Sequence, residues 1–325
     1  MEYTHLGRSG VSVSRICLGT MNFGGYTKPE TAHLIMSSAL DNGINFFDTS
    51  NTYGQPRAEG VTESVIGDWF ASGGGRRDKV VLATKLYGGK GDWPNDRFLS
   101  AVNIRQACEA SLRRLRTDHI DLYQMHHVDR QTPWDEIWEA FAVLRQQGKV
   151  IYFGSSNFAG WHLAQGQEAA HRHGVFGLVS EQSLYNLAAR TVELEVLPAC
   201  QGYGLGVLPW SPLHGGLLGG ILAKEADNSG RSGGGRAAQM LEGKRDKVEA
   251  YESFCASLGE PAGDVALAWL LHQPAVTAPI AGPRTMDHLD SAIRAVDLRL
   301  DDKALSRLDE IFPGPGGAAP EAYAW

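Results

Sequence analysis

The chain has 325 residues, 43% of them hydrophobic, which is enough for one large core or for two domains of ordinary size. Its formal net charge is −7 and it has no long run of like charges, which argues against nucleic acid as the main partner. No stretch is apolar enough to cross a membrane, and no basic and then apolar leader opens the sequence. We therefore expect neither a membrane span nor a signal peptide.

Four cysteines lie far apart in the chain, without a Cys-x-x-Cys pair or a tight His/Cys cluster: Cys17, Cys108, Cys200 and Cys255. Such cysteines are typical of buried free thiols rather than of disulfides or zinc ligands. We therefore expect a cytoplasmic protein without a metal site.

The first segment, "MEYTHLGRSGVSVSRI", predicts a small hairpin with its turn between Gly7 and Gly10. Short apolar runs follow, rich in β-branched or aromatic residues and flanked by Gly, Asp or Ser, as is typical of buried parallel strands. There are eight of them: "RICLGT", "INFFDT", "VVLATK", "HIDLYQMH", "VIYFGSS", "GLVSEQ", "LGVLPWS" and "VTAPIAG".

Helical patterns separate these runs, beginning with "PETAHLIMSSALDNG", which has Pro29 in its first turn and Gly43 at its end. The others are "SAVNIRQACEASLRRL", "TPWDEIWEAFAVLRQQG", "GWHLAQGQEAAHRHG", "TVELEVLPACQGYG", "PAGDVALAWLLHQ" and "MDHLDSAIRAV". Because parallel neighbours need crossovers and eight strands can close without an edge, this alternation predicts a (β/α)₈ barrel. A doubly wound open sheet is the alternative.

Two segments fall outside the alternation. Residues 213–247 are glycine-rich and are predicted to be irregular, and a loop of this length is usually functional or disordered. After the last strand, "DKALSRLDEIF" predicts an additional C-terminal helix, followed by a Pro/Gly/Ala tail. No domain boundary is evident, so we expect residues 1–325 to form a single domain.

Active-site residues of such a barrel lie at the carboxyl ends of its strands. The second run ends in Asp48, with Tyr53 in the loop beyond it, the third ends in Lys85 and the fourth in His126. Taken singly, each has an ordinary structural explanation: a turn cap, a loop aromatic, a solvated cation and a hydrogen-bonded imidazole. Their occurrence on consecutive strands, at the same end, favours a catalytic site.

This combination of side chains suits the reduction of a carbonyl group. A tyrosine of pKa ~10 is a weak acid at neutral pH, an adjacent ammonium lowers that pKa, and a carboxylate offsets the burial of the ammonium. A histidine can hold the carbonyl oxygen. The hydride must come from a cofactor, because no side chain supplies one.

The segments "GTMNFGG", "NGINFFDTSNTYG", "ATKLYG", "SLRRLRTDHIDLYQMH", "GKVIYFGSSNF", "SEQSLYN", "PWSPLHGGLLGG" and "PIAGPRTMDHL" span Leu6 to about Leu308. In their residues, order and spacing the chain resembles the aldo-keto reductases. This resemblance implies that Tyr53 is the general acid and that Asp48, Lys85 and His126 complete a catalytic tetrad.

The resemblance also implies a site for NADP(H). Ser156, Asn157 and Gln182 match positions that hold the nicotinamide carboxamide, and Trp210 matches an aromatic residue beside the nicotinamide ring. Without the family, "GGLLGG" is more typical of a flexible loop than of a phosphate site. The remaining implied cofactor residues lie in the pyrophosphate loop and after the last strand: Ser211, Leu213, Gly215, Gly216, Gly282, Arg284 and His288.

Two departures from the family pattern concern the end of the cofactor site. Ala292 and His288 stand where members commonly have Asn, and often Gln or Arg, and the lysine that members often have near Ile221 is missing. Arg284 is placed to meet the 2′-phosphate, or is a surface arginine at a helix start. Arg231 or Arg236 would close over the cofactor. NADPH is the expected cofactor.

Two branches of the family look closest: bacterial reductases of nucleotide-activated deoxyhexoses, and cytosolic β-subunits of voltage-gated potassium channels, which act as binding partners. A general aldehyde and ketone reductase is the third possibility. The expected partner is a small carbonyl compound, with no nucleic acid and no membrane, and a homo-oligomer stays open. Loop residues near strand ends are the pocket candidates: Met21, Phe23, Tyr26, Tyr87, Trp93, His127 and Trp161.

Overall fold

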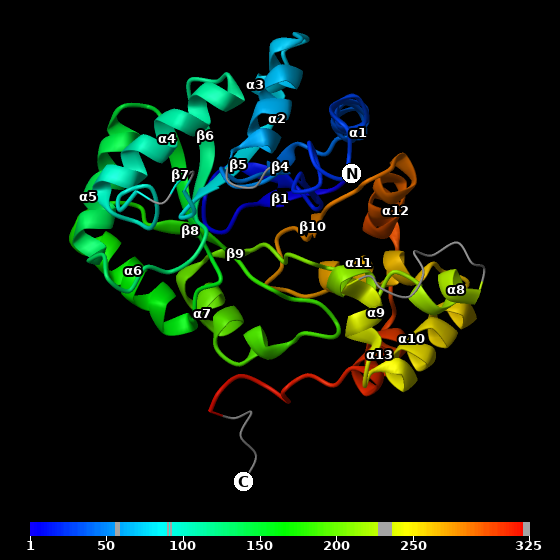
Figure 1. Cartoon of the computed structure of the whole chain (residues 1–325). Helices are drawn as coiled ribbons and strands as arrows, with labels where there is room; N and C mark the ends of the chain where they lie inside the picture. The colour runs from blue at the N-terminus through cyan, green and yellow to red at the C-terminus, as the bar shows by residue number, and fades with distance from the viewer. Residues whose placement is uncertain (56–58, 90, 92, 227–235, 321–325) are drawn as a thin grey trace.

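The protein is described by a computed structural model over residues 1–55, 59–89, 91, 93–226 and 236–320 (Figure 1). At its centre lies one parallel sheet in the order β10-β3-β4-β5-β6-β7-β8-β9. These strands are β3 (Cys17–Gly19), β4 (Phe46–Asp48), β5 (Val81–Leu86), β6 (Ile120–Met125), β7 (Val150–Ser156), β8 (Leu178–Gln182), β9 (Gly206–Val207) and β10 (Ile280–Ala281).

The two outer strands of this order meet each other. Thr277 N donates to Val207 O at 2.9 Å and Ile280 N donates to Pro209 O at 2.8 Å, so the segment leading into β10 pairs with β9. The sheet is therefore closed, which confirms the predicted (β/α)₈ barrel and excludes the open sheet. Every predicted strand run overlaps one of the eight strands.

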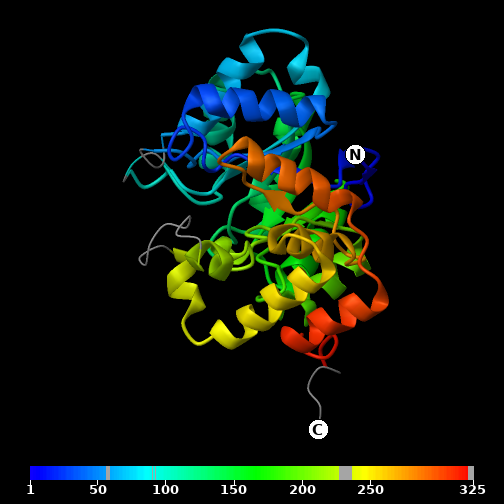
Figure 2. The same ribbon diagram turned by 90° about the vertical axis from the view of Figure 1, so that its right-hand side faces the viewer.

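Helices form an outer layer around the sheet, as both ribbon views show (Figures 1 and 2). Most follow the strands as crossovers, and α13 is the additional C-terminal helix that the sequence predicts. None of the described helices is both long and apolar enough to span a membrane. The helices are α1 (Pro29–Asp41), α2 (Val61–Ala71), α3 (Arg76–Lys79), α4 (Ala101–Leu115), α5 (Trp134–Gln146), α6 (Gly160–Arg172), α7 (Val196–Tyr203), α8 (Ile221–Ala226), α9 (Arg236–Leu241), α10 (Arg245–Leu258), α11 (Ala262–Leu271), α12 (Met286–Asp297) and α13 (Asp302–Ile311).

The predicted hairpin is present as β1 (Tyr3–His5) and β2 (Ser12–Ser14), and it fills the amino-terminal mouth of the barrel. Leu6 and Val13 are fully buried in the cluster of side chains inside the barrel, against Phe46 and Val179. A Cβ on Gly7 would come within 2.4 Å of Val179 O, so this close approach requires glycine. Figure 2 shows the hairpin on the right and the loop after β5 on the left, at opposite ends of the barrel.

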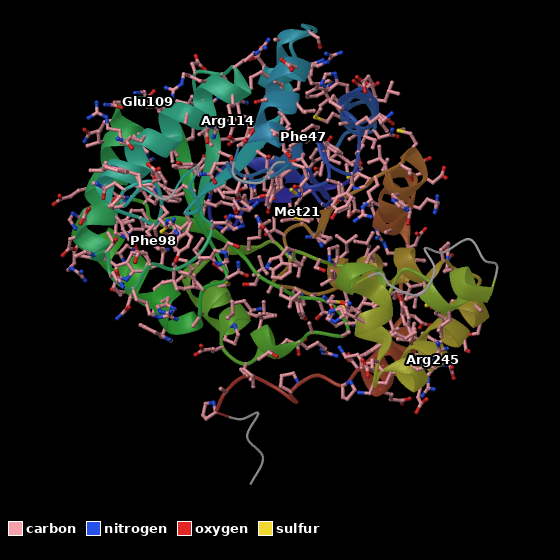
Figure 3. The ribbon with its side chains drawn as sticks, viewed as in Figure 1. Met21, Phe47, Phe98, Glu109, Arg114 and Arg245 are labelled. Atoms are coloured by element: carbon pink, nitrogen blue, oxygen red, sulfur yellow. The ribbon has the colours of Figure 1, made fainter. Side chains whose placement is uncertain are left out.

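Helix α2 is a feature that the sequence patterns do not reveal. Its residues are buried on nearly all sides, so it lacks the apolar stripe by which an amphipathic helix is recognised. Phe47 of β4 and Arg114 of α4, both labelled in Figure 3, lie against it: the Phe47 ring stacks on Trp69 at 5.7 Å, and the Arg114 guanidinium pairs with Glu63 at 2.6 Å.

The prediction of an irregular segment over residues 213–247 is wrong in part. The structure has a 3₁₀ turn at His214–Gly216, then α8, α9 and the start of α10, while residues 227–235 lie outside the described part. Helices α8 and α9 are only 6 residues long, too short to show a helical period among so many glycines.

Candidate active site

Two strand positions direct charged side chains into the barrel at its carboxyl end. Alternate residues of a strand share a face, so Asp48 follows the inward-facing Phe46, and Lys85 follows the inward-facing Ala83. The Lys85 Nζ donates to Asp48 Oδ2 at 2.6 Å, to Thr49 O at 2.8 Å and to Tyr53 Oη at 3.1 Å. One ammonium thus joins the carboxylate to the phenol, and its side chain has no exposed surface.

The second oxygen of Asp48 is held by two amides. Gln124 Nε2 and Gln182 Nε2 donate to Asp48 Oδ1 at 3.0 and 2.9 Å, from β6 and β8. Gln124 is a site residue that the sequence reasoning missed. A glutamine two positions before His126 in the predicted strand was the available signal, since alternate residues face the same way.

Burial and charge act in opposite directions on the pKa values of this cluster. Burial lowers the pKa of Lys85, but Asp48 and Tyr53 outweigh it, so the pKa lies above its ordinary value and the ammonium stays charged. Burial raises the pKa of Tyr53, and Lys85 opposes this without reversing it. The sequence reasoning weighed only the ammonium and expected a lowered pKa. In the structure Tyr53 keeps its proton at neutral pH.

His126 lies beside the phenol, with its ring edge-on to the Tyr53 ring at 5.8 Å between centroids. Its Nδ1 is 3.3 Å from the Ser50 hydroxyl. Burial, the Lys85 ammonium and His127 together lower the pKa of His126 to about 2, so the imidazole is neutral at physiological pH. A neutral imidazole next to a protonated phenol is suited to hold a carbonyl oxygen.

The residues expected at the nicotinamide lie next to this cluster. Asn157 Oδ1 accepts from Trp210 Nε1 at 2.9 Å, and Asn157 Nδ2 donates to His126 O at 3.3 Å and to Ser156 Oγ at 3.0 Å. Gln182 links this group to the cluster inside the barrel. Its side chain donates to Asp48, and its backbone carbonyl accepts from Asn157 N at 3.0 Å. Amides, a hydroxyl and an indole face fit a nicotinamide with its carboxamide.

A buried carboxyl on the outer face of β8 supports the backbone at Ser156 and Asn157, where β7 ends. Glu181 accepts hydrogen bonds from the Ser155 hydroxyl, from Ser183 Oγ at 2.7 Å and from Phe158 N at 3.0 Å. Burial raises the pKa of Glu181 to about 7. Asn157 has a left-handed φ of 61°, and Glu181 binds the residues on both sides of the Ser156–Asn157 pair. The sequence reasoning did not single out Glu181.

The expected pyrophosphate loop follows β9 and has an unusual backbone. Ser211, His214, Gly215 and Gly216 all have positive φ, at 53°, 49°, 68° and 105°, and Gly215 N donates to Ser211 Oγ at 3.1 Å. Two of these residues are not glycine, and left-handed backbone of this kind forms concave sites for anions. The loop therefore fits a phosphate group, with Leu213 packed against the core beneath it.

Arg284 links the exits of β10 and β3. Its guanidinium lies 4.7 Å from the centre of the Tyr26 ring, and its Nε donates to Asn22 Oδ1 at 3.3 Å. Asn22 in turn donates to Gly282 O at 3.0 Å, and His288 Nδ1 lies 3.4 Å from Arg284 N. The terminal nitrogens of Arg284 have no hydrogen-bond partner within the part of the chain that the structure describes, so they fit an anionic ligand.

Three other residues were considered for this end of the cofactor site. Ala292 is buried in the core. Arg231 and the side chain of Arg236 lie outside the described residues, so their expected closure over the cofactor stays a prediction.

The pocket candidates divide into three groups. Tyr87 and His127 lie next to His126, with His127 stacked on it at 5.0 Å and Tyr87 at 5.2 Å from His127. Phe23 has no exposed surface and packs in the core with residues of α1 and α2, so it supports its loop instead of lining a pocket. The remaining candidates are largely exposed: Met21, Tyr26, Trp93 and Trp161.

All four cysteines are buried and free, as predicted. Across the residues that the structure describes, no group of three or more His, Cys, Asp or Glu side chains could hold a metal ion.

The arrangement of Asp48, Tyr53, Lys85 and His126 at the carboxyl end of a closed barrel agrees with comparisons to known proteins. The aldo/keto reductase family matches residues 15–312. This chain belongs to the aldo/keto reductase family. As a member of that family it is an oxidoreductase, and the family generally uses NAD(P)H.

Relatives of this aldo/keto reductase cover nearly all of its length. It is 57% identical, over 100% of both chains, to "Uncharacterized oxidoreductase YrpG" of Bacillus subtilis (strain 168). It is 32% identical to "Versiconal hemiacetal acetate reductase" of Aspergillus parasiticus, over 96% of this chain and 97% of the relative. It is also 31% identical to "Probable voltage-gated potassium channel subunit beta" of Arabidopsis thaliana, over 99% of this chain and 100% of the relative.

Proposed function

We propose that this aldo/keto reductase uses NADPH to reduce the carbonyl group of a small molecule to an alcohol, with Tyr53 as the general acid. The observation that carries this proposal is the Lys85 ammonium, which contacts both Asp48 Oδ2 and Tyr53 Oη. An ion pair that served only to stabilise the fold would not need a phenol hydrogen-bonded to its ammonium. A general acid does need a neighbouring cation, which stabilises the phenolate left after proton transfer.

Each residue has a distinct task in the proposed reaction. Tyr53 gives its proton to the carbonyl oxygen as negative charge develops there, and Lys85 stabilises the resulting phenolate. The neutral His126 donates a hydrogen bond to the same oxygen and orients the carbonyl. Asp48 keeps the buried ammonium charged and in place. A bound NADPH supplies the hydride.

The cofactor is proposed to lie across the carboxyl end of the barrel. Ser156, Asn157 and Gln182 would hold the carboxamide, with Trp210 beside the ring. The left-handed turn over residues 211–216 would hold the pyrophosphate. The terminal guanidinium nitrogens of Arg284, which bond to no other described residue, support a 2′-phosphate and hence NADPH over NADH.

The second candidate is a regulatory subunit that binds the cofactor with little turnover. The potassium-channel relative favours it, because that likeness covers 99% of this chain. The keto-deoxysugar substrate, the cytoplasmic location, the single domain and a homo-oligomer stay predictions. No contact in the described residues selects a nucleotide or a sugar.

Turnover separates the two candidates. We would follow NADPH oxidation with a panel of aldehydes and ketones and identify the alcohol by mass spectrometry, alongside a binding titration of NADPH. Turnover that yields one alcohol per NADPH supports the reductase. Tight NADPH binding with no alcohol formed from any carbonyl compound would overturn it in favour of the regulatory subunit.

A further inference from the structure

Residues 155–158, at the carboxyl end of β7, are held by two consecutive residues of β8. The side chain of Glu181 accepts from the Ser155 hydroxyl and from Phe158 N at 3.0 Å, so it bonds to the first and the last of the four. The two residues between them bond to the backbone carbonyl of Gln182, through a hydroxyl at 2.9 Å and a backbone N–H at 3.0 Å. One carboxyl side chain thus fixes both ends of the segment that contains the proposed carboxamide residues.

An irregularity in β8 places this carboxyl. The pairing of β7 with β8 shifts by one residue between Phe153 and Gly154, which leaves Val179 as an extra residue in β8. Val179 packs inside the barrel, and alternate residues of a regular strand share a face, so a regular β8 would turn Glu181 inwards as well. The shift instead turns Glu181 outwards and the side-chain amide of Gln182 into the barrel. Bulges beside active sites redirect side chains in this way.

The backbone between the two Glu181 contacts needs this support. Asn157 has a left-handed φ of 61°, a conformation that costs free energy in a residue other than glycine. In this conformation Asn157 Oδ1 accepts from Trp210 Nε1 at 2.9 Å, and Asn157 Nδ2 donates to His126 O at 3.3 Å and to Ser156 Oγ at 3.0 Å. A backbone that relaxed to the right-handed region would take the amide away from all three partners.

One oxygen of the carboxyl accepts hydrogen bonds in either protonation state. Phe158 N and Ser183 Oγ donate to Glu181 Oε1 at 3.0 and 2.7 Å, and the Ser155 hydroxyl donates to Oε2. Burial raises the pKa of Glu181 to about 7, so the acid and the carboxylate are both present at neutral pH. In the acid form Oε2 can donate to Ser155 Oγ, whose own hydroxyl then turns to Ser180 O at 3.4 Å. The contact with Phe158 N therefore depends on Oε1 and not on a charge.

We propose that Glu181 is a positioning residue of the cofactor site: its Oε1 fixes Phe158 N, and with it the left-handed Asn157 that would hold the nicotinamide carboxamide. This inference rests on the proposed cofactor site and adds to it a residue that touches neither cofactor nor substrate. Glu181 acts on the nicotinamide end of the cofactor alone, because Arg284 and residues 211–216 are held by other contacts.

The test compares the binding of NADPH with that of 2′-phospho-ADP-ribose, which lacks the nicotinamide. Both ligands are titrated by calorimetry into wild type, Glu181→Met and Glu181→Gln. Methionine keeps the length of the side chain but has no oxygen, so Glu181→Met should weaken NADPH binding about tenfold and leave 2′-phospho-ADP-ribose within about twofold of wild type. Glutamine keeps Oε1 and donates from Nε2 to Ser155 Oγ, so Glu181→Gln should bind both ligands as wild type does.

The matched control is Glu63→Gln. Glu63 is also a carboxyl without exposed surface, but it bonds to Thr84 Oγ1 at 2.6 Å and to Arg114 at 2.6 Å, where α2 meets β5 and α4. Its replacement should lower the melting temperature and leave the ratio of the two affinities unchanged. The positioning role is overturned if Glu181→Met weakens both ligands equally or neither, if Glu181→Gln loses as much as Glu181→Met, or if the control changes the ratio as well.

Glu181→Asp replaces Glu181→Met if that protein is unfolded by circular dichroism. Aspartate keeps the charge but withdraws the carboxyl by one methylene group from Phe158 N, so NADPH binding should weaken in the same direction and 2′-phospho-ADP-ribose binding should not. Wild-type affinity for NADPH in Glu181→Asp would refute the inference and leave the proposed reduction intact. If wild type binds neither ligand, the proposed cofactor site itself fails, an outcome distinct from a site that binds both and is indifferent to Glu181.

Discussion

At the scale of single residues, the site depends on an ion pair removed from water. Asp48 is 2% exposed and the Lys85 side chain is fully buried, and two buried charges are tolerated only where each is satisfied by its partner and by further hydrogen bonds. Gln124, Gln182 and Thr49 supply those bonds. If Lys85 lost a proton, the buried Asp48 carboxylate would have no cation beside it. If Tyr53 loses its proton, the phenolate is paired with the Lys85 ammonium, so Tyr53 is the member of this group that can act as an acid.

Tyr53→Phe should remove the acid and keep the ring. We expect kcat to fall by about 10²–10⁴, the usual contribution of general acid catalysis. NADPH affinity and the melting temperature should stay close to those of wild type, because among the described residues the hydroxyl is hydrogen-bonded to Lys85 alone. Steady-state kinetics, a fluorescence titration and a thermal melt measure the three quantities. Unimpaired reduction would exclude Tyr53 as the acid.

Lys85→Met should destabilise the fold by about 3–5 kcal/mol, because it leaves the Asp48 carboxylate buried without a cation. Replacing the acid as well, in Asp48→Asn/Lys85→Met, removes the unpaired charge and should recover a large part of that loss. Urea unfolding of wild type, both single variants and the double variant measures the coupling. If the double variant is as unstable as the sum of the single ones, the two residues act independently and the ion pair is not what stabilises the site.

The neutral His126 predicts a pH dependence of stability. Its pKa is about 2 in the folded protein and about 6.5 in an unfolded chain, so between these values the unfolded chain binds one more proton. Stability therefore falls as the pH is lowered from about 6.5. In His126→Gln this contribution is absent, so its unfolding free energy should decline less steeply between pH 7 and about pH 5 in urea titrations at each pH. Parallel curves would show that His126 is protonated in the folded state.

At the scale of elements, the strands were predictable because each is buried on both faces and reads as a short apolar run. That the four side chains of the candidate site lie together was predictable, because parallel strands of a barrel bring their carboxyl ends to one rim. Helix α2 was not predictable, because a helix that is buried on nearly all sides has no alternation of apolar and polar residues at the helical period. Gln124 and Glu181 were not singled out either, because their contacts depend on the register of the strands. The direction of the pKa shift of Tyr53 was not predictable, because it depends on how deeply the phenol is buried, which no local sequence pattern reveals.

Helix α2 also explains a requirement for glycine. A Cβ on Gly67 would come within 2.1 Å of Arg114 O, so Gly67→Ala must push α2 away from α4 and should destabilise the protein by about 1–3 kcal/mol. Gly202, in α7, is the matched control, because a Cβ there meets nothing within 4 Å. Gly202→Ala should stabilise by about 0.5–1 kcal/mol. Denaturant unfolding of both variants tests the pair, and equal effects would contradict the close approach.

At the scale of the whole molecule, the proposed cofactor site draws on loops that are distant in the chain and adjacent around the rim. Arg284 follows β10, the last barrel strand along the chain. It contacts Tyr26 and Asn22, which follow β3, the first barrel strand. A phosphate that binds Arg284 would therefore be held where the two ends of the sheet meet.

Arg284→Ala should weaken NADPH binding more than NADH binding. We expect a difference of about tenfold, at the lower end for a charge-assisted contact, because Arg284 already has Tyr26 and Asn22 as partners and gains less from a phosphate. Fluorescence titrations with both cofactors measure it. Arg8→Ala, at the opposite end of the barrel, is the control. Equal weakening of both cofactors would exclude a contact with the 2′-phosphate.

The closure of the sheet also bears on how the chain folds as it is synthesised. Strand β3 is made early, yet its neighbour β10 is among the last segments to leave the ribosome, and the same late segment pairs with β9. Until then both strands present unpaired backbone groups, which can join to another nascent chain. A polypeptide interrupted before Val276 would keep these edges permanently, so translation must reach that point before the protein is protected from association with its own copies.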